Sequence, residues 1–347
     1  MFVTLGRYLL IAMEWVNDNM IHSYAIAIIV FTGVLKLLAM PADIKQRRSM
    51  ARTQSLQPEV EQIQKRYSGN PDIAQKKVQE LYKKNNASMT AGCLPMMLTM
   101  LIFMVFLRAM TFWSYLGTID LYKNAREQEV AALQSGQEFV IEKDGANDFI
   151  HKNYKVLWVN NIWSPDSFRS QVIMPYSQFA QTDFSQLDLF YTADELREIK
   201  AITAADYNRT MKPYVDAYGE NKNGWGFLPV LAALSMLIIS LVQQKLNPQP
   251  KPAAGAGGNP AAGMSTPMMV MMAAMSGWIC FTSNAGFAIY WLVSNVFGFF
   301  ITISIHLPGF LEKRKKAAAN GIAVTEDQDA RRLTNDIKSK AKKKKKR

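Results

Sequence analysis

Five apolar stretches constrain the fold of this chain more than any other feature. They run over Ile21–Met40, Cys93–Trp113, Gly226–Leu246, Pro267–Thr282 and Ala285–Ile305. A helix needs roughly 20 apolar residues to cross a bilayer. Lipid admits only helices or closed barrels, because every backbone polar group must be bonded internally, and no barrel-type alternation recurs here. The sequence therefore predicts an all-α, polytopic membrane protein with five transmembrane helices.

The average composition hides this segregation. The 347 residues carry a net charge of +12 and a mean hydropathy of −0.06, values that would suit a soluble basic protein. The two cysteines, Cys93 and Cys280, lie in or beside apolar stretches, and the three histidines are scattered. Neither a metal-ligand spacing nor a phosphate loop or hydrolase motif is present. We expect no cofactor, no metal and no enzymatic activity.

Flanking charge predicts the orientation in the membrane. Ten basic and five acidic residues fall in Pro41–Asn86, and fourteen basic and five acidic residues in 308–347. By contrast, Ser114–Trp225 has eleven basic and sixteen acidic residues. Because basic segments stay on the cytoplasmic side, we expect the N-terminus outside, the C-terminus inside, and Ser114–Trp225 outside.

The predicted organisation follows from these boundaries. Residues 1–20 should form an interfacial amphipathic helix, and residues 21–113 the first two spans with a cytoplasmic helical hairpin at 42–86. Residues 114–225 should form a partly helical extracytoplasmic loop. Residues 226–306 hold spans three to five around a flexible linker at 247–266, and residues 307–347 form a basic, largely disordered cytoplasmic tail.

Two polar segments have helical periodicity. In the first, apolar residues between Met50 and Tyr67 recur at threes and fours, and a second such run follows Pro71. Gly69 and Pro71 are turn residues, so a hairpin with coiled-coil packing is expected, and Pro58 should kink or divide its first helix. Asp194–Tyr218 should be helical up to Gly219. The aromatic residues of Leu157–Asp166 are expected at the lipid headgroup level.

A lysine within the first apolar stretch is the strongest functional signal. Lys36 lies five residues before Pro41, with Thr32 one turn away on the same helix face. A cation inside a bilayer costs roughly 2.5–3.5 kcal/mol on insertion scales, so it needs a partner, a wet cavity or a route to the interface. Arg108, in the second stretch, is expected to reach outward to the headgroups.

Several blocks resemble one family in their order along the chain. They are Ser49–Pro71 (SMARTQSLQPEVEQIQKRYSGNP), Gln79–Pro95 (QELYKKNNASMTAGCLP), Leu157–Asp166 (LWVNNIWSPD), Phe227–Leu246 (FLPVLAALSMLIISLVQQKL) and Phe287–Asn295 (FAIYWLVSN). Together they resemble the YidC/Oxa/Alb membrane protein insertases, in particular the Gram-positive type of bacterial member. The family usually has arginine where Lys36 stands.

The resemblance implies a positively charged, aqueous groove that receives nascent membrane proteins and releases their transmembrane segments into the bilayer. It implies groove residues Lys36, Thr32, Thr99, Gln243, Gln244, Trp291 and Asn295. It further implies contact of the basic end with the ribosome or anionic phospholipids, through Lys342, Lys343, Lys344, Lys345, Lys346 and Arg347. Operation beside the Sec translocon, action as a monomer and a multi-pass place in the bacterial plasma membrane also follow from it.

Purely structural roles of these candidate residues also fit the sequence. Lys36 could reach to the inner headgroups, Gln243 and Gln244 could be interface residues, and Asn295 could only bond neighbouring helices. Two other functions fit the same charges. One is an anion or solute transporter or channel that uses Lys36 and Arg108, and the other is a non-catalytic assembly scaffold that docks partners on the hairpin and the tail.

Overall fold

The computed structural model describes residues 2–85, 94–219, 222–246 and 266–319, with side chains for these except 46–54, 94–100, 246, 266 and 305–319. The described part is helical, with loops and one isolated bridge between Val156 and Val159. The chain divides into two units, residues 1–299 and 300–347. What is described of the second unit is the end of helix α12.

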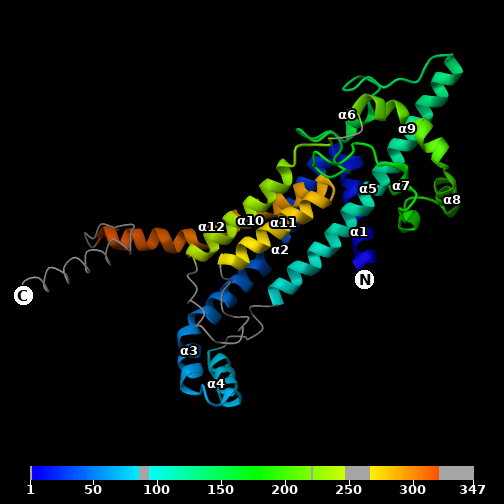
Figure 1. Cartoon of the computed structure of the whole chain (residues 1–347). Coiled ribbons are helices and arrows are strands. Elements are labelled where there is room, and N and C mark those ends of the chain that lie inside the picture. The colour runs from blue at the N-terminus through cyan, green and yellow to red at the C-terminus, as the bar shows by residue number, and fades with distance from the viewer. Residues whose placement is uncertain (1, 86–93, 220–221, 247–265, 320–347) are drawn as a thin grey trace, which may run out of the picture. The chain divides into compact units, whose positions relative to one another are not determined.

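The helices follow one another as labelled in Figure 1. The long ones are α2 (Tyr24–Ser55), α5 (Leu94–Ser135), α10 (Phe227–Leu246), α11 (Thr266–Thr282) and α12 (Ala285–Ala319). The others are α1 (Phe2–Val16), the π-helical turn η1 (Asn17–Ile21), α3 (Gln57–Arg66), α4 (Pro71–Lys84), α6 (Phe149–Asn153), α7 (Tyr176–Phe179), the 3₁₀ turn η3 (Phe184–Leu187), α8 (Ala193–Ala201) and α9 (Ala204–Tyr218).

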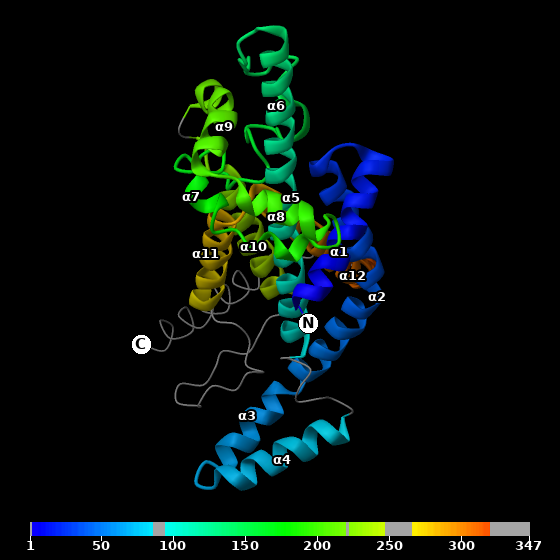
Figure 2. The ribbon, with the colours of Figure 1, turned by 90° about the vertical axis from the view of Figure 1, so that its right-hand side faces the viewer.

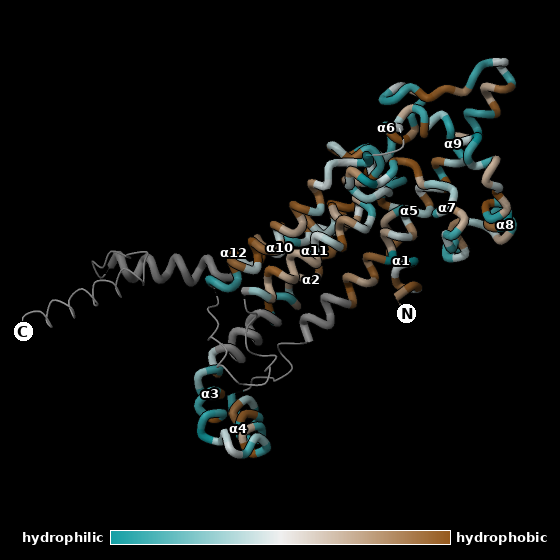
Figure 3. The backbone as a smooth tube through the Cα atoms, viewed as in Figure 1, coloured by the Kyte–Doolittle hydropathy of each residue, from teal (hydrophilic) through white to brown (hydrophobic). Residues whose placement is uncertain are grey.

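Four of the five predicted spans lie in helices long and apolar enough to cross a membrane. They overlap the candidate membrane spans Tyr24–Lys45, Leu101–Ser135, Phe227–Lys245 and Ala285–Ser304. The remaining predicted span, which is fourth along the chain, is the shorter apolar helix Pro267–Thr282. It is about 24 Å long at 1.5 Å per residue. Figure 3 shows the apolar colour along α10, α11 and α12, whereas α3 is largely hydrophilic. The all-helical membrane class is confirmed.

Two of these helices continue beyond their apolar stretches. Helix α2 runs through Pro41, which membrane helices tolerate, and ends only at Ser55. Helix α5 has 42 residues, about 63 Å, and continues past Trp113 to Ser135. The polar extension of α5 still buries one face, because Leu116, Ile119 and Ala125 are almost inaccessible. A buried face stabilises a helix where an apolar stretch has ended.

Helices α3 and α4 pack on each other around a small core of their own. The core contains Leu56, Val60, Val78 and Tyr82. Helix α3 begins at Gln57 with Pro58 in its first turn, where a missing N–H costs nothing. Pro58 therefore divides the first helical run, as its position in the sequence predicted.

Helix α1 lies along α5 in both views of the ribbon (Figures 1 and 2). Its contact face consists of Gly6, Leu10 and Met13, all buried. Its opposite side exposes further apolar residues, among them Tyr8 and Trp15. With apolar surface on both sides, α1 suits a helix held between protein and lipid.

The inter-span region, which we define as residues 136–225, is folded and packs on α5. Its aromatic core includes Tyr154 and Tyr214, both fully buried. The helical segment predicted at Asp194–Tyr218 is present as two helices, because Thr203 starts α9 by accepting a hydrogen bond from the Asp206 N–H at 3.2 Å. Helix α9 ends before Gly219 (φ 73°), as expected.

One aromatic residue of Leu157–Asp166 differs from its expected place. Trp163 is 6% exposed and packs edge-on against Tyr24 and near Trp113, with ring centroids 5.0 and 5.3 Å away. Gly117 makes this possible, since an added Cβ would lie 2.2 Å from the indole nitrogen of Trp163. Trp163 therefore joins α2, α5 and the inter-span region instead of facing headgroups.

A buried polar cluster ties the inter-span region to the start of α10. The Asp166 carboxylate, fully buried, accepts hydrogen bonds from the N–H groups of Gly226 and Leu228 at 2.9 and 2.8 Å, and from the Trp158 indole at 3.0 Å. Helix N-termini favour such an anion. Fully buried Asn223 donates to the carbonyls of Asn161, Ser164 and Pro165.

The inter-span backbone also meets the start of α12. The N–H groups of Ala285 and Gly286 donate to the carbonyls of Ser164 and Ile162, both at 3.0 Å. Asn284 accepts from the Phe287 N–H at 2.9 Å and donates to the Met110 carbonyl of α5 at 3.0 Å. The first turns of α10 and α12 are thus fixed by the same short segment.

Substitution Asp166→Ala should lower the free energy of unfolding by about 2–4 kcal/mol, because it leaves three donors without their acceptor in a buried site. The thermal midpoint of the detergent-solubilised protein, followed by tryptophan fluorescence, measures this. Asp194→Ala is the matched control, since Asp194 pairs with Arg197 at the surface and such pairs contribute under about 1 kcal/mol. Equal shifts for the two variants would contradict the structural role of Asp166.

Candidate functional site

Residues 285–299 of α12 contact three other long helices. The Phe297 ring packs on Gly33 of α2, where an added Cβ would lie 3.1 Å from it. Asn295 donates a hydrogen bond to the Ser235 hydroxyl of α10 at 2.9 Å. Trp291 meets Phe103 of α5 edge-on, with centroids 5.1 Å apart. The candidate residues of α12 therefore lie where the helices meet.

The candidate residues of α2 differ in their surroundings. Thr32 is 1% exposed, and its hydroxyl donates to the Ile28 carbonyl at 2.6 Å. Lys36, one turn further along the same helix, is half-buried. The Thr32 hydroxyl thus donates within its own helix, whereas Lys36 is the residue of this pair that carries a charge.

The remaining candidates are described only in part. Gln243 and Gln244 are half-buried in the last turns of α10. Thr99 lies in α5, but its side chain is outside the described ones, and the basic end Lys342–Arg347 lies outside the described residues altogether. Arg108 is exposed on α5, beside α1.

The candidates of α12 contact α10 and α5. Asn295 bonds a neighbouring helix, as the alternative explanation of this residue expected, through one of its two amide N–H donors. The indole nitrogen of Trp291 is buried and has no hydrogen-bond partner among the described residues. Trp291 therefore has an unused donor next to α5.

An aromatic layer, which we define as Phe103, Phe106, Phe287, Tyr290 and Trp291, closes the interface between α5 and α12. Phe106 stacks on Tyr290 with centroids 3.5 Å apart. Phe103 contacts both Phe287 and Trp291, at 5.6 and 5.1 Å. Edge-to-face and stacked pairs of this kind contribute about 0.5–1.5 kcal/mol each beyond burial.

A cavity of about 650 Å³ lies on one side of this layer. Residues of three segments line it: the part of α5 around Thr111, the inter-span residues 163–178, and the turn between α11 and α12 with Phe287. Its lining includes hydroxyl and amide side chains and the guanidinium of Arg169. Lys36, Gln243, Gln244, Trp291 and Asn295 are not among its lining residues.

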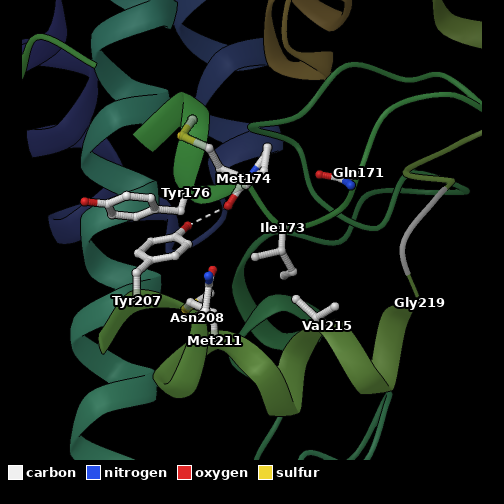
Figure 4. Close-up of a pocket in the computed structure, with 10 residues that line it drawn as sticks. Gln171, Ile173, Met174, Tyr176, Tyr207, Asn208, Met211, Val215 and Gly219 are labelled. Atoms are coloured by element: carbon white, nitrogen blue, oxygen red, sulfur yellow. Dashed lines mark hydrogen bonds between the residues drawn. The ribbon is translucent and has the colours of Figure 1, made fainter. Parts of the chain in front are cut away.

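A second cavity, of about 200 Å³, lies between the inter-span segment 171–176 and α9 (Figure 4). Tyr176, Tyr207, Met211 and Val215 give it a largely apolar wall. The Tyr207 hydroxyl donates to the Met174 carbonyl at 2.7 Å and so closes one side. This cavity adjoins the larger one, because the same inter-span residues line both: Gln171, Ile173, Met174 and Pro175.

A half-buried carboxyl joins α1 to α5. Glu14 accepts a hydrogen bond from the indole N–H of Trp113. The pKa of Glu14 is raised to about 8, chiefly by burial and also by the nearby carboxylates of Asp18 and Asp120, whereas the Trp113 hydrogen bond opposes the increase. Where the chain is described, no group of three or more His, Cys, Asp or Glu side chains could hold a metal ion.

A family model described as "60Kd inner membrane protein" matches residues 15–308. That match covers most of the chain, from the end of α1 into α12. The chain belongs to the YidC/Oxa/Alb insertase family. The resemblance found in the sequence blocks is thereby confirmed.

Bacterial relatives support this assignment. The protein named membrane protein insertase YidC of Clostridium perfringens is 29% identical over 164 residues, which cover 47% of this chain and 53% of that protein. Its namesake in Leptospira interrogans is 27% identical over 196 residues, covering 56% of this chain and 26% of that protein. A Listeria monocytogenes insertase is 34% identical over 122 residues, covering 31% and 42%. The chain thus spans about half or less of the relatives it matches.

The structure identifies functional candidates in this family member that the sequence alone did not single out. Asp166 and Asn223 are buried polar residues in an aromatic-rich segment, and that contrast is a signal that could have found them. Arg169 follows Asp166 by three residues but gives no comparable signal. Only the tertiary structure brings it to the wall of the larger cavity.

The contact of α1 with α5 should weaken as pH rises through the range from about 5 to about 8. A carboxyl with a raised pKa binds its proton more tightly in the docked state, so stability is lost as the proton leaves. Hydrogen exchange of α1 between pH 5 and 9 measures this. Glu14→Gln should make the protection independent of pH, whereas the exposed control Glu138→Gln should leave the slope unchanged. A pH slope that survives in Glu14→Gln would contradict the assignment.

Proposed function

We propose that this protein is a membrane protein insertase, which receives nascent membrane proteins in a hydrophilic, positively charged groove and releases their transmembrane segments into lipid. Family membership supports the class. Such a protein is a binding and partitioning device, and no bond is made or broken. Nascent chains are its substrates, and the bacterial plasma membrane is its site of action.

The position of Lys36 on α2 is the observation that carries this proposal. Ile26, Val30 and Leu37 form an exposed apolar stripe suited to lipid. At 3.6 residues per turn, Lys36 lies about 100–120° away from Val30 and Leu37. Exposed Ile29 lies on the same face as Lys36, two turns before it, and buried Thr32 lies one turn before it. The half-buried Lys36 is therefore at the boundary between the exposed and the buried faces of α2.

The proposed topology has five spans, with the N-terminus outside and the C-terminus inside. The charge of the segments between spans supports it, because the basic regions then lie inside and the acidic Ser114–Trp225 outside. The α3–α4 pair is on the cytosolic side in this arrangement. The short α11 is the fourth span, paired with α10 along its length.

An acidic residue in the outward-going tail of a substrate would be attracted to Lys36. Low dielectric strengthens such a pairing, and the pairing is transient because the tail moves on outward. Groove residues that accompany Lys36 are Thr32, Thr99, Gln243, Gln244, Trp291 and Asn295. Lysine in place of the usual family arginine keeps the charge but lacks the planar five-donor fork.

Partners on the cytosolic side follow from the basic end. Lys342–Arg347 carry six positive charges in a row, which attract ribosomal RNA by counterion release and anionic lipid by surface potential. We propose both contacts, with the protein acting as a monomer, alone or beside the Sec translocon.

Substitution Lys36→Ala should lower insertion of a single-span substrate with an acidic outer tail by about tenfold, equivalent to about 1.4 kcal/mol. Protease protection of the substrate in reconstituted vesicles measures it. Lys36→Arg should retain activity, and Lys45→Ala, an exposed lysine of the same helix, should have little effect. Normal insertion by the Lys36→Ala variant would contradict the groove hypothesis.

The same variants separate the proposal from its rivals. An anion channel would show salt-gradient-driven anion flux in liposomes, lost in Lys36→Ala. An assembly scaffold would tolerate Lys36→Ala but fail when the basic end is removed.

Deletion of residues 342–347 should weaken ribosome binding and flatten its dependence on salt. Each lost charge reduces the slope of log affinity against log salt by about 0.7 for single-stranded RNA. Co-sedimentation with ribosomes at several salt concentrations measures this. A variant with all six residues as arginine keeps the charge and should bind like the original. An unchanged slope after deletion would remove the ribosome from the proposal.

A further inference from the structure

The 650 Å³ cavity beside the aromatic layer has the size and lining of a binding site. Ligand pockets usually measure about 300–1,000 Å³ and place a few polar groups on an otherwise apolar wall. Here Leu107, Met110 and Phe287 supply apolar surface. Thr111, Gln171 and Gln178 supply hydroxyl and amide groups. The site can therefore take a ligand that is both polar and apolar along its length.

The charge of the cavity favours an acidic ligand. Among its described lining residues, Arg169 is charged and none is acidic. The Arg169 side chain is exposed, and its guanidinium lies 5.6 Å from the ring centroid of Phe168. A guanidinium can bind a carboxylate through two parallel N–H groups. The side chains of Gln171 and Gln178 are also exposed. Such amides can pair with the N–H and C=O groups of a peptide backbone.

The wall between this cavity and the proposed groove is thin. Phe287 lines the cavity, and Trp291, a proposed groove residue, follows it by one helical turn, about 6 Å. Phe103 bridges the two rings. Side chains of the aromatic layer therefore lie next to both the cavity and Trp291, and side chains change rotamer far faster than helices move.

We propose that this cavity is a second substrate site, which binds the acidic, extended tail segment of an inserting membrane protein after it has passed the aromatic layer. The inference rests on the proposed insertase function and deepens it. Lys36 attracts the tail on the cytosolic side, the aromatic layer parts, and Arg169 holds the tail on the outer side. Two cations on either side of a thin apolar layer give the tail a favourable position at each stage of transfer.

The segment that covers the cavity is held rigidly enough for the cavity to bind a substrate tail. Its roof is the segment that Asp166 and Asn223 fix to the start of α10, and Ser164 is bonded to the start of α12. A preformed site loses less entropy on binding than one that must first be ordered.

Photocrosslinking tests the site directly. A benzoylphenylalanine replaces Gln178 in the cavity, half-buried Met40, which lies one turn from Lys36 on the same face of α2, or Gln137, an exposed glutamine near the end of α5, and Lys36 is kept in every variant. The probe is a ribosome-bound single-span nascent chain with an acidic tail, arrested at increasing lengths. We expect crosslinks from position 40 at short lengths and from position 178 at longer ones, and far fewer from position 137.

The outcomes separate the two proposals. Crosslinks from position 40 without any from position 178, at every length, overturn the second site and leave the insertase function standing. Crosslinks from neither position overturn both. Equal crosslinks from positions 178 and 137 also overturn the second site, because they show contact with the outer surface in general.

Charge reversal provides an independent readout. Arg169→Glu should lower crosslinking of the acidic tail from position 178 by about tenfold, since like charges replace opposite ones, and a tail with lysines should gain. Arg169→Lys should retain most of the signal. Arg197→Glu, at an exposed arginine of α8, controls for net charge. Unchanged crosslinking by Arg169→Glu, with normal protein abundance in the membrane, overturns the role of Arg169.

Discussion

The buried Asp166 carboxylate is the interaction on which the rest of the described structure depends. It satisfies two backbone N–H groups at the start of α10, which would otherwise be left without partners at a helix end. Through Asn223 and Ser164 the same segment reaches the first turn of α12. A single short stretch of chain thus sets the starts of two membrane-spanning helices and the roof of the larger cavity. Helix positions, cavity shape and the aromatic layer are therefore not independent features.

In the proposed mechanism, side chains of the aromatic layer alone separate the larger cavity from the groove. Backbone segments in a bilayer must keep their hydrogen bonds, so a barrier made of helices could open only by moving whole helices. Rings such as Phe103 and Trp291 form contacts of about 0.5–1.5 kcal/mol. A passing substrate can replace those contacts with its own. An insertase without nucleotide chemistry needs a barrier of this kind, closed at rest and inexpensive to part.

The sequence predicted the class of fold because apolar length is a local property. The spans, the α3–α4 pair divided at Pro58, and the end of α9 at Gly219 all follow from residues a few positions apart. Tertiary contacts determine the features that the sequence did not predict. Helix α5 continues beyond Trp113 because Ile119 and Ala125 find partners in distant segments, and Trp163 is buried because Gly117 leaves it room. Arg169 reaches the cavity wall through the path of a loop, which no periodicity describes.

The length of α5 makes it a lever. Its 22 residues beyond Trp113 extend about 33 Å, with the inter-span core packed along one side. A tilt of about 10° near the aromatic layer, such as a bulky segment leaving sideways would cause, displaces the far end by about 6 Å. A substrate segment within the bilayer would thereby shift the far end of α5, and no part of the chain would have to unfold.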